Sequence, residues 1–355
     1  MQGKQIMKRL IFIVVFAVVV YQTGRQFFMA EEREARNYIY GQLKTVFTES
    51  AKVAANGYGL SYLRGGQRIA LTAMKNQLPA GDRTRPAVVL IHGLDEPGRI
   101  WVNLAPVLDK AGFNVFYMTY PNDQKITASA NLFFHALETM PRFISGKIVI
   151  IGHSMGGLVS REMLTSPEIN YAALASLGRV PSVTDLIMVG TPNHGSQLAR
   201  FRFVMELKEQ ILNLIETDAG LLQGLMDGTG AAGLDLIPGS PFLTRLNRRP
   251  HPAGVRLHVI AGLLVPWSDA EIKTAARGIG QLLPNGEDGG LGRSLTKMTH
   301  MLGDGLVSLD SATLDHIPLT RVRGNHMTML RNLRSDSDRV PPAVPVILNL
   351  IDQHD

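Results

Sequence analysis

Residues 148–157 read Ile-Val-Ile-Ile-Gly-His-Ser-Met-Gly-Gly, and this stretch decides the fold. It opens with four β-branched residues, which predict a buried strand, and it runs into residues 158–164, which have the pattern of a helix. Between the two, Gly152 and Gly156 flank Ser154, and glycine allows strand and helix to approach closely in a tight turn. The stretch therefore predicts a serine on a sharp strand-to-helix turn with its hydroxyl exposed. The alternative is an ordinary glycine-rich loop.

Strand and helix patterns alternate along the rest of the chain. Strands are expected at 87–91, 113–120, 147–152, 183–189, 256–263 and 317–322, and helices at 100–110, 128–140 and 158–164. Residues 57–76 predict a hairpin around the turn Arg64-Gly65-Gly66-Gln67. Such alternation is typical of an α/β fold with a mostly parallel central sheet, flanked by helices and joined by right-handed crossovers.

Composition narrows the class of protein. With 355 residues, 45% hydrophobic and 19% charged, the chain is expected to fold as a globular enzyme-sized unit. The absence of cysteine excludes disulfides, thiol catalysis and cysteine metal sites. The net charge of +6 is scattered and accompanies no nucleic-acid motif, so no nucleic-acid partner is expected.

The N-terminus has a targeting pattern. Lys4, Lys8 and Arg9 precede the apolar run 10–21, and no A-x-A-like cleavage site follows. Residues 1–29 are therefore expected to be an uncleaved signal anchor or transmembrane segment, and residues 30–56 a helical stalk. This arrangement places a catalytic domain, residues 57–355, on the outer side of the inner membrane in a bacterial cell envelope. The alternatives are a cleaved signal with a secreted enzyme, or a buried core segment.

A long segment interrupts the alternation of strands and helices between residues 189 and 256. Within it Val204, Leu207 and Ile211 share one helical face, and a glycine-rich stretch follows. Residues 197–250 are expected to form a helical lid insertion whose apolar face opens at a lipid surface. The alternative is a helix that simply packs on the domain.

Ser154 needs a histidine to accept its proton and a carboxylate to orient that histidine. For a serine on such a turn, the order along the chain is serine, acid, histidine. His316, His326 and His354 satisfy this order. His326 is favoured because it follows the expected strand 317–322, whereas His316 precedes it and His354 is at the frayed end of the chain.

Asp304 is the expected acid. It lies on a turn between Gly303 and Gly305, upstream of the histidine. An ordinary Asp-Gly turn is the alternative reading. The competing carboxylates are Asp269, Asp288, Asp310 and Asp315.

The oxyanion of an acyl-transfer intermediate requires backbone N–H donors. One is expected from Met155, directly after the serine, and one from Leu94 in the loop His92-Gly93-Leu94. His92 and His153 precede the acid, so a structural role is expected for both.

These motifs together resemble bacterial triacylglycerol lipases and related α/β-hydrolases, over roughly residues 87–330. The motifs are His92-Gly93-Leu94, Gly152 to Gly157, residues 189–196, residues 303–308 and His326. The resemblance implies an α/β-hydrolase fold, the triad Ser154, Asp304 and His326, and an ester substrate. His194 is then expected to be structural.

The sequence departs from these lipases in two ways. Met327-Thr328-Met329 stands where they often carry a calcium-binding aspartate after the histidine, so no metal and no cofactor are expected. Those lipases are also usually secreted and often disulfide-bonded, whereas this chain has the apparent anchor and no cysteine.

The sequence thus predicts a serine esterase or lipase that cleaves carboxylic esters, of lipid or acylglycerol type, through an acyl-enzyme. The expected partners are an ester or lipid substrate and a membrane, reached through the anchor and the lid. An acyltransferase, thioesterase or amidase of the same fold is an alternative, as is a non-catalytic membrane-tethered binding protein.

Overall fold

An eight-stranded sheet in the order β2-β1-β4-β3-β5-β6-β7-β8 forms the centre of the fold. The computed structural model describes residues 58–74, 78, 85–94, 98–121, 124–140, 144, 147–196, 231–264, 300–334 and 336–352. The strands are β1 (Gly59–Arg64), β2 (Gln67–Ala70), β3 (Ala87–Ile91), β4 (Asn114–Thr119), β5 (Ile148–His153), β6 (Val183–Val189), β7 (Arg256–Leu263) and β8 (Leu319–Arg323). All of them belong to the unit Asn56–Asp355.

The sheet is mostly parallel, as the sequence predicts. β1 pairs antiparallel with β2 and β4, whereas every pair from β4 through β3, β5, β6 and β7 to β8 is parallel. The β1–β2 hairpin turns at Gly65 and Gly66, where the sequence predicts it, and both glycines have positive φ. The carboxyl ends of six strands therefore lie at one edge of the sheet, which is where ligand sites form in α/β folds.

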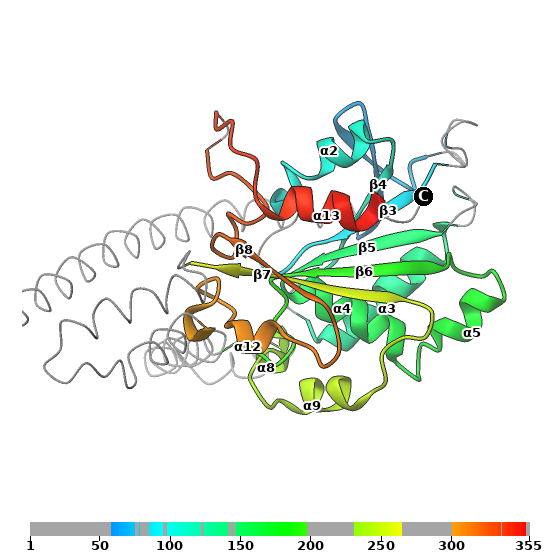
Figure 1. Cartoon of the computed structure of the whole chain (residues 1–355). Helices are drawn as coiled ribbons and strands as arrows, with labels where there is room; N and C mark the ends of the chain where they lie inside the picture. Colours follow the sequence, from blue (N-terminus) through cyan, green and yellow to red (C-terminus); the bar gives the residue numbers. More distant parts are fainter. Residues whose placement is uncertain are drawn as a thin grey trace, which may run out of the picture. The chain divides into compact units, whose positions relative to one another are not determined.

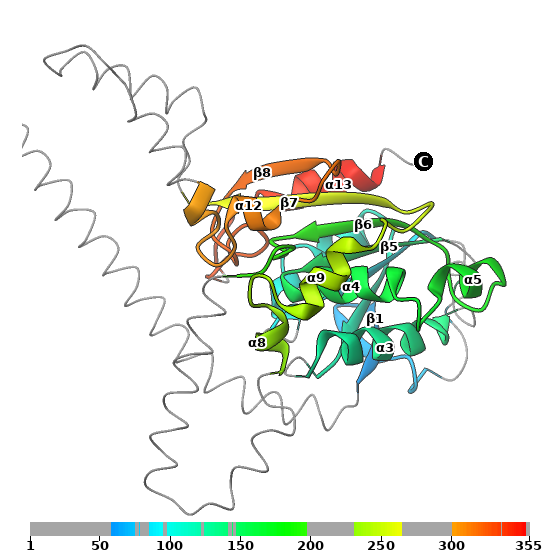
Figure 2. The same ribbon diagram turned by 90° about the horizontal axis from the view of Figure 1, so that it is seen from below.

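Helices cover both faces of the sheet (Figures 1 and 2). They are the 3-10 helix η1 (Arg99–Trp101), α2 (Ala105–Lys110), α3 (Ile126–Leu137), α4 (Met155–Thr165), α5 (Tyr171–Ser176), α8 (Ala231–Asp235), α9 (Pro241–Arg248), α12 (Leu309–Ala312) and α13 (Ala343–Asp352). In Figure 1, α2 and α13 lie above the sheet, and α3, α4 and α9 lie below it.

Each face has its own hydrophobic core because successive side chains of a strand point to opposite sides. In β3, Val89 and Ile91 pack on the side of α3 and α4, whereas Val88 and Leu90 pack on the side of α2 and α13. All of β3 is buried. A strand buried on both faces reads as a continuous apolar run, and for this reason the sequence identifies these strands well.

The predicted length of one helix is wrong. The sequence predicts a continuous helix over 100–110, but the structure has η1 and then a separate α2 that starts at Ala105. Pro106 is the physical reason, because it has no N–H to donate to the preceding turn and fits only at a helix start.

Several predictions fall outside the described residues. These are the expected anchor (1–29), the expected stalk (30–56) and the first part of the expected lid, residues 197–230. Among the residues that the structure describes, no helix is both long and apolar enough to cross a membrane. The last part of the expected lid forms α8 and α9, and α9 packs on the domain through Phe242, Leu243 and Leu246.

Candidate active site

Ser154 lies on the turn between β5 and α4, at the carboxyl edge of the sheet. Its φ of 53° and ψ of −126° are values that side-chain-bearing residues rarely adopt, and the residue is half-buried. Its N–H donates to the Val189 carbonyl at 2.9 Å, which fixes the turn to β6. The predicted strand-to-helix turn is therefore present.

Three glycines permit this turn. A Cβ on Gly152 would lie 2.6 Å from a backbone nitrogen of α4, and one on Gly156 would lie 2.6 Å from the His92 carbonyl oxygen. A Cβ on Gly93 would lie 2.7 Å from Ser154 Cβ and 3.3 Å from its Oγ. Any larger residue would push apart β5, α4 and the loop after β3.

Asp304 and His326 form a buried hydrogen-bonded pair. His326 Nδ1 donates to Asp304 Oδ2 at 2.8 Å, and the two side chains are only 8% and 1% exposed. The other carboxylate oxygen, Oδ1, accepts from the N–H groups of Leu306 and Val307 at 2.9 and 2.8 Å. Because Nδ1 is the donor, the neutral imidazole has a free lone pair on Nε2 and is able to accept a proton there.

Tight turns hold both members of this pair. Asp304 stands between Gly303 and Gly305, which both have positive φ. His326 lies in a turn after β8, and two hydrogen bonds between Asn325 and Thr328 close this turn. Asn325 Oδ1 accepts from the Thr328 N–H at 2.8 Å, and Thr328 Oγ1 accepts from the Asn325 N–H at 2.9 Å. The His326 N–H donates to the Asp304 carbonyl at 3.0 Å, so backbone and side chain join the same two residues.

The end of β6 and the residue after it lie between Ser154 and this Asp304–His326 pair. Val189 accepts from the serine N–H, and a Cβ on the next residue, Gly190, would lie 3.2 Å from both Asp304 Oδ2 and His326 Cε1. Within the described part of the chain, no hydrogen bond connects Ser154 Oγ directly to His326. The structure thus brings the three predicted residues to one edge of the sheet, around Val189 and Gly190.

The competing candidates lie elsewhere. Asp310 is 81% exposed, and Asp315 is also exposed. His316 precedes β8 and is exposed, at the end of the strand opposite to His326. Asp269, Asp288 and His354 lie outside the described residues.

The loop of the expected oxyanion donor Leu94 is braced by Tyr120. The Tyr120 hydroxyl donates to the His92 carbonyl at 2.6 Å, and the two rings stack with centroids 4.5 Å apart. His92 Nδ1 donates to the Gly93 carbonyl at 2.8 Å. Burial lowers the pKa of His92 to about 4, so the ring stays neutral at physiological pH. Met155, the other expected donor, is the first residue of α4 and is fully buried.

His153 supports His326. Its Nε2 donates to the His326 carbonyl at 2.9 Å, and the two ring centroids lie 4.7 Å apart. Burial, reinforced by the neighbouring His326, lowers the pKa of His153 well below its usual value of 6.5. A neutral His153 therefore donates a hydrogen bond that holds the loop of His326 in place. This contact fits the structural role expected for His153.

Sequence reasoning missed a polar network behind the loop after β6. Arg161 of α4 donates to the side-chain oxygens of Asn193 and Asn247, both at 3.0 Å. Asn193 Nδ2 donates to the Ala312 carbonyl at 2.8 Å, and burial lowers the pKa of Arg161 to about 10. The available signal was the charged pair Arg161 and Glu162 within a helix whose other residues are mostly apolar or small. Exposed His194 touches only the rim of this network, at Asn247.

Comparison with known proteins agrees with this architecture. The family described as "PGAP1-like alpha/beta domain" matches residues 139–223, which include the serine turn. A search of curated proteins finds no match. The mature lipase BlEst2 of Bacillus licheniformis is similar in structure, with a TM-score of 0.50 and 18% identity, over 76% of this chain and 93% of the lipase.

Two further solved structures are similar over most of the chain. A metagenomic carboxyl esterase has a TM-score of 0.49 and 18% identity, over 84% of this chain and 83% of the esterase. The lipase of Staphylococcus hyicus has a TM-score of 0.49 and 13% identity, over 78% of this chain and 96% of the lipase. The parallel sheet, the serine turn and the likeness to BlEst2 together show that the chain has the α/β-hydrolase fold of the bacterial lipases and esterases.

Proposed function

We propose that the chain is a serine hydrolase that cleaves carboxylic esters, with lipid or acylglycerol esters as the substrate class. The observation that carries this proposal is the buried Asp304–His326 hydrogen bond of 2.8 Å, at the same edge of the sheet as a serine on a strained turn. A solvated Asp-His pair at a surface is common, but one that is buried at the carboxyl edge of a parallel sheet is the arrangement that orients a general base.

The proposed chemistry gives each of the three side chains one role. His326 Nε2 takes the proton of Ser154 as its Oγ attacks the ester carbonyl, and Asp304 stabilises the imidazolium that forms. Collapse of the tetrahedral intermediate expels the alcohol, protonated by His326, and leaves an acyl-serine. A water molecule activated by the same histidine then releases the carboxylic acid and restores the serine.

The oxyanion of the intermediate requires fixed donors on the side of the serine that faces the β3 loop. Gly93 lies directly against Ser154, and the N–H groups of Leu94 and Met155 are the proposed donors. Met155 is also the first residue of the eleven-residue helix α4, whose N-terminus favours a negative charge. The brace from Tyr120 to the His92 carbonyl keeps this loop in place before substrate binds.

Hydrolysis of p-nitrophenyl esters of increasing acyl length, by wild type and Asp304→Asn, tests this proposal. The asparagine oxygen still accepts from Leu306 and Val307, so its amide group faces His326 Nδ1 and forces the wrong tautomer. We expect kcat to fall about 10³- to 10⁴-fold while the fold is retained. Asp310→Asn is the matched control at an exposed carboxylate, and its kcat should equal that of wild type.

Two results would contradict the proposal. One is an Asp304→Asn variant as active as wild type. The other is a wild type that hydrolyses no ester of any chain length. The same assay with an added alcohol acceptor distinguishes hydrolysis from acyl transfer, because only transfer yields a new ester.

A further inference from the structure

A hollow lies on the side of the sheet covered by α2, and none of the three proposed triad residues lines it. Its volume is about 640 Å³, and we call it the basic hollow. It is lined by Leu63, Gly66 and Arg68 of the hairpin region, Gly98, Arg99 and Val102 around η1, Pro106, Asp109 and Lys110 of α2, Tyr117 of β4, and Arg331. The hydrolytic chemistry proposed above makes no use of these groups.

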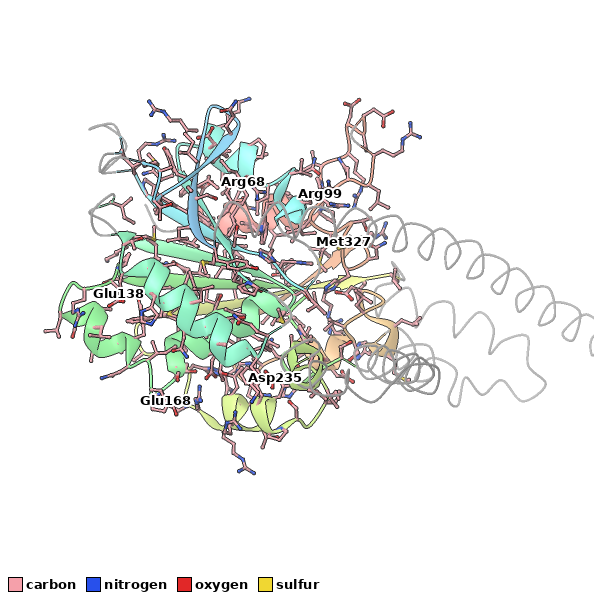
Figure 3. The ribbon with its side chains drawn as sticks, turned by 180° about the vertical axis from the view of Figure 1, so that it is seen from behind. Arg68, Arg99, Glu138, Glu168, Asp235 and Met327 are labelled. Carbon is pink, nitrogen blue, oxygen red and sulfur yellow. The ribbon has the colours of Figure 1, made fainter. Side chains whose placement is uncertain are left out.

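The charge of the basic hollow is strongly positive. Four of its lining residues are cationic and only Asp109 is acidic. Arg85 shares that carboxylate, with its Nη2 4.0 Å from Asp109 Oδ1. Figure 3 shows Arg68 and Arg99 near each other on one side of the sheet, and Glu138, Glu168 and Asp235 on the other. Among the described residues that line the hollow, an anion would therefore meet more cations than carboxylates.

Two of the guanidinium groups are fixed rather than mobile. Arg68 lies 3.8 Å above the ring of Tyr117, and its Nη2 donates to the Gly98 carbonyl at 2.7 Å. Arg331 is 7% exposed, and burial lowers the pKa of its guanidinium. Fixed cations lose little conformational entropy on binding, and the low dielectric around Arg331 strengthens its attraction to an anion.

The arrangement of the charged groups favours some anions over others. Three of the lining cations are guanidinium groups, and this planar group with paired N–H donors matches the several oxygens and the double charge of a phosphate better than a single carboxylate. Leu63, Val102 and Pro106 add an apolar wall, against which the glycerol or acyl part of a lipid would pack. We propose that the basic hollow binds a phosphate group, either of inorganic phosphate or of a lipid headgroup. This inference does not rest on the proposed hydrolase activity.

Calorimetric titration in the Ser154→Ala background tests this inference, because that variant leaves any ester in the ligand intact. The probes are inorganic phosphate, dihexanoyl phosphatidic acid below its micelle concentration, and uncharged dihexanoylglycerol. We expect the two phosphate compounds to bind, and to bind more weakly as salt is added. Dihexanoylglycerol is of the proposed substrate class but carries no phosphate, so any binding of it should change neither with salt nor with the arginine variants described below. Tighter binding of the phosphatidic acid would assign a lipid headgroup, and equal binding would assign free phosphate.

Arginine variants locate the site. Arg99→Gln should weaken binding about tenfold and Arg68→Gln/Arg99→Gln about a hundredfold, because each removes a charged hydrogen-bond donor. Arg64→Gln/Arg179→Gln removes the same charge from exposed positions outside the basic hollow and should bind as the parent does. Arg99→Gln alone keeps the contacts of Arg68 and remains informative if the double variant fails to fold.

Three results would overturn the inference. They are no binding of either phosphate compound at low salt, equal binding by the parent and both hollow variants, and equal loss in the Arg64→Gln/Arg179→Gln control. Since the parent has no Ser154 hydroxyl, none of these results depends on whether the enzyme hydrolyses esters.

Discussion

Ser154 has a strained backbone conformation at the proposed active site. Its φ of 53° with ψ of −126° falls in a region that glycine occupies freely, and a side chain held there costs of the order of 1–3 kcal/mol. The hydrogen bond to Val189 and the packing of α4 hold the turn against this cost. We take the strain to be the means by which the hydroxyl is held clear of the sheet.

Replacement of Ser154 by glycine and by alanine measures this strain. Glycine relieves it but loses more chain entropy on folding, so we expect Ser154→Gly to be about 1 kcal/mol more stable than Ser154→Ala. Both variants should be inactive on esters. Urea unfolding of the pair checks the prediction, and a Ser154→Gly variant less stable than Ser154→Ala by the full entropy cost of glycine, about 0.5–1 kcal/mol, would show that the turn is not strained.

The order of residues along the chain predicts three side chains that the structure brings to one edge of the sheet, and their catalytic roles stay a prediction. Ser154, Asp304 and His326 were identifiable because each stands on a turn that follows or joins a recognisable element. Gly190 lies in the motif at residues 189–196, but its role was not predictable, because that role comes from the approach of two loops that lie far away in the sequence. The donor role of His153 toward the His326 carbonyl has the same origin, since 173 positions separate the two residues.

At the scale of elements, buried strands were the easiest to predict and helix boundaries the hardest. β3, β6 and β7 have the predicted limits, because runs of apolar β-branched residues are unambiguous when both faces are covered. α3 begins at Ile126, two residues before the expected start, and its first N–H donates to Asp235 of α8 at 2.9 Å. A cap supplied by an element so distant in sequence gives no local signal.

The loop after β6 offers a prediction at this scale. An added methyl on Gly190 would lie 2.8 Å from Met329 Cε and 3.2 Å from both Asp304 Oδ2 and His326 Cε1, at a φ of 60°. We expect Gly190→Ala to lower kcat at least tenfold, because displacement of the base misaligns proton transfer. Steady-state kinetics on a p-nitrophenyl ester checks this.

Gly233→Ala is the matched control for that variant. Gly233 lies in α8, and its added methyl would meet nothing within 4 Å. Its activity should be unchanged, and its stability should rise by about 0.5–1 kcal/mol, because alanine is favoured over glycine in a helix. Equal kinetics for the two alanine variants would refute the role given to the loop.

At the scale of the whole molecule, buried histidines make stability depend on pH. The pKa of His92 is about 4 in the folded state and 6.5 is its usual value, so the unfolded state binds more protons between these limits. The contribution of neutral His92 to the free energy of unfolding is therefore fully present above pH 6.5, and it is lost as the pH falls toward 4. The loss attributable to His92 at pH 4.5 is roughly 2–3 kcal/mol.

Urea unfolding at pH 7 and pH 4.5 tests this dependence. His92→Asn removes the titrating group while its amide is able to donate to the Gly93 carbonyl, so it should lose roughly 2–3 kcal/mol less than wild type over this interval. His316→Asn, at an exposed histidine, should behave as wild type does. An equal loss in wild type and His92→Asn would show that His92 does not remain neutral in the fold.

The nucleophilic role of Ser154 is the centre of this account, and covalent labelling tests it most directly. The protein is treated with a fluorophosphonate and digested with trypsin, and the modified site is read by fragmentation of peptide 148–161, which contains both Ser154 and Ser160. We predict an adduct on Ser154, full labelling of Ser160→Ala and no labelling of Ser154→Ala. Labelling that persists in Ser154→Ala, or an adduct on a different serine, would contradict the account.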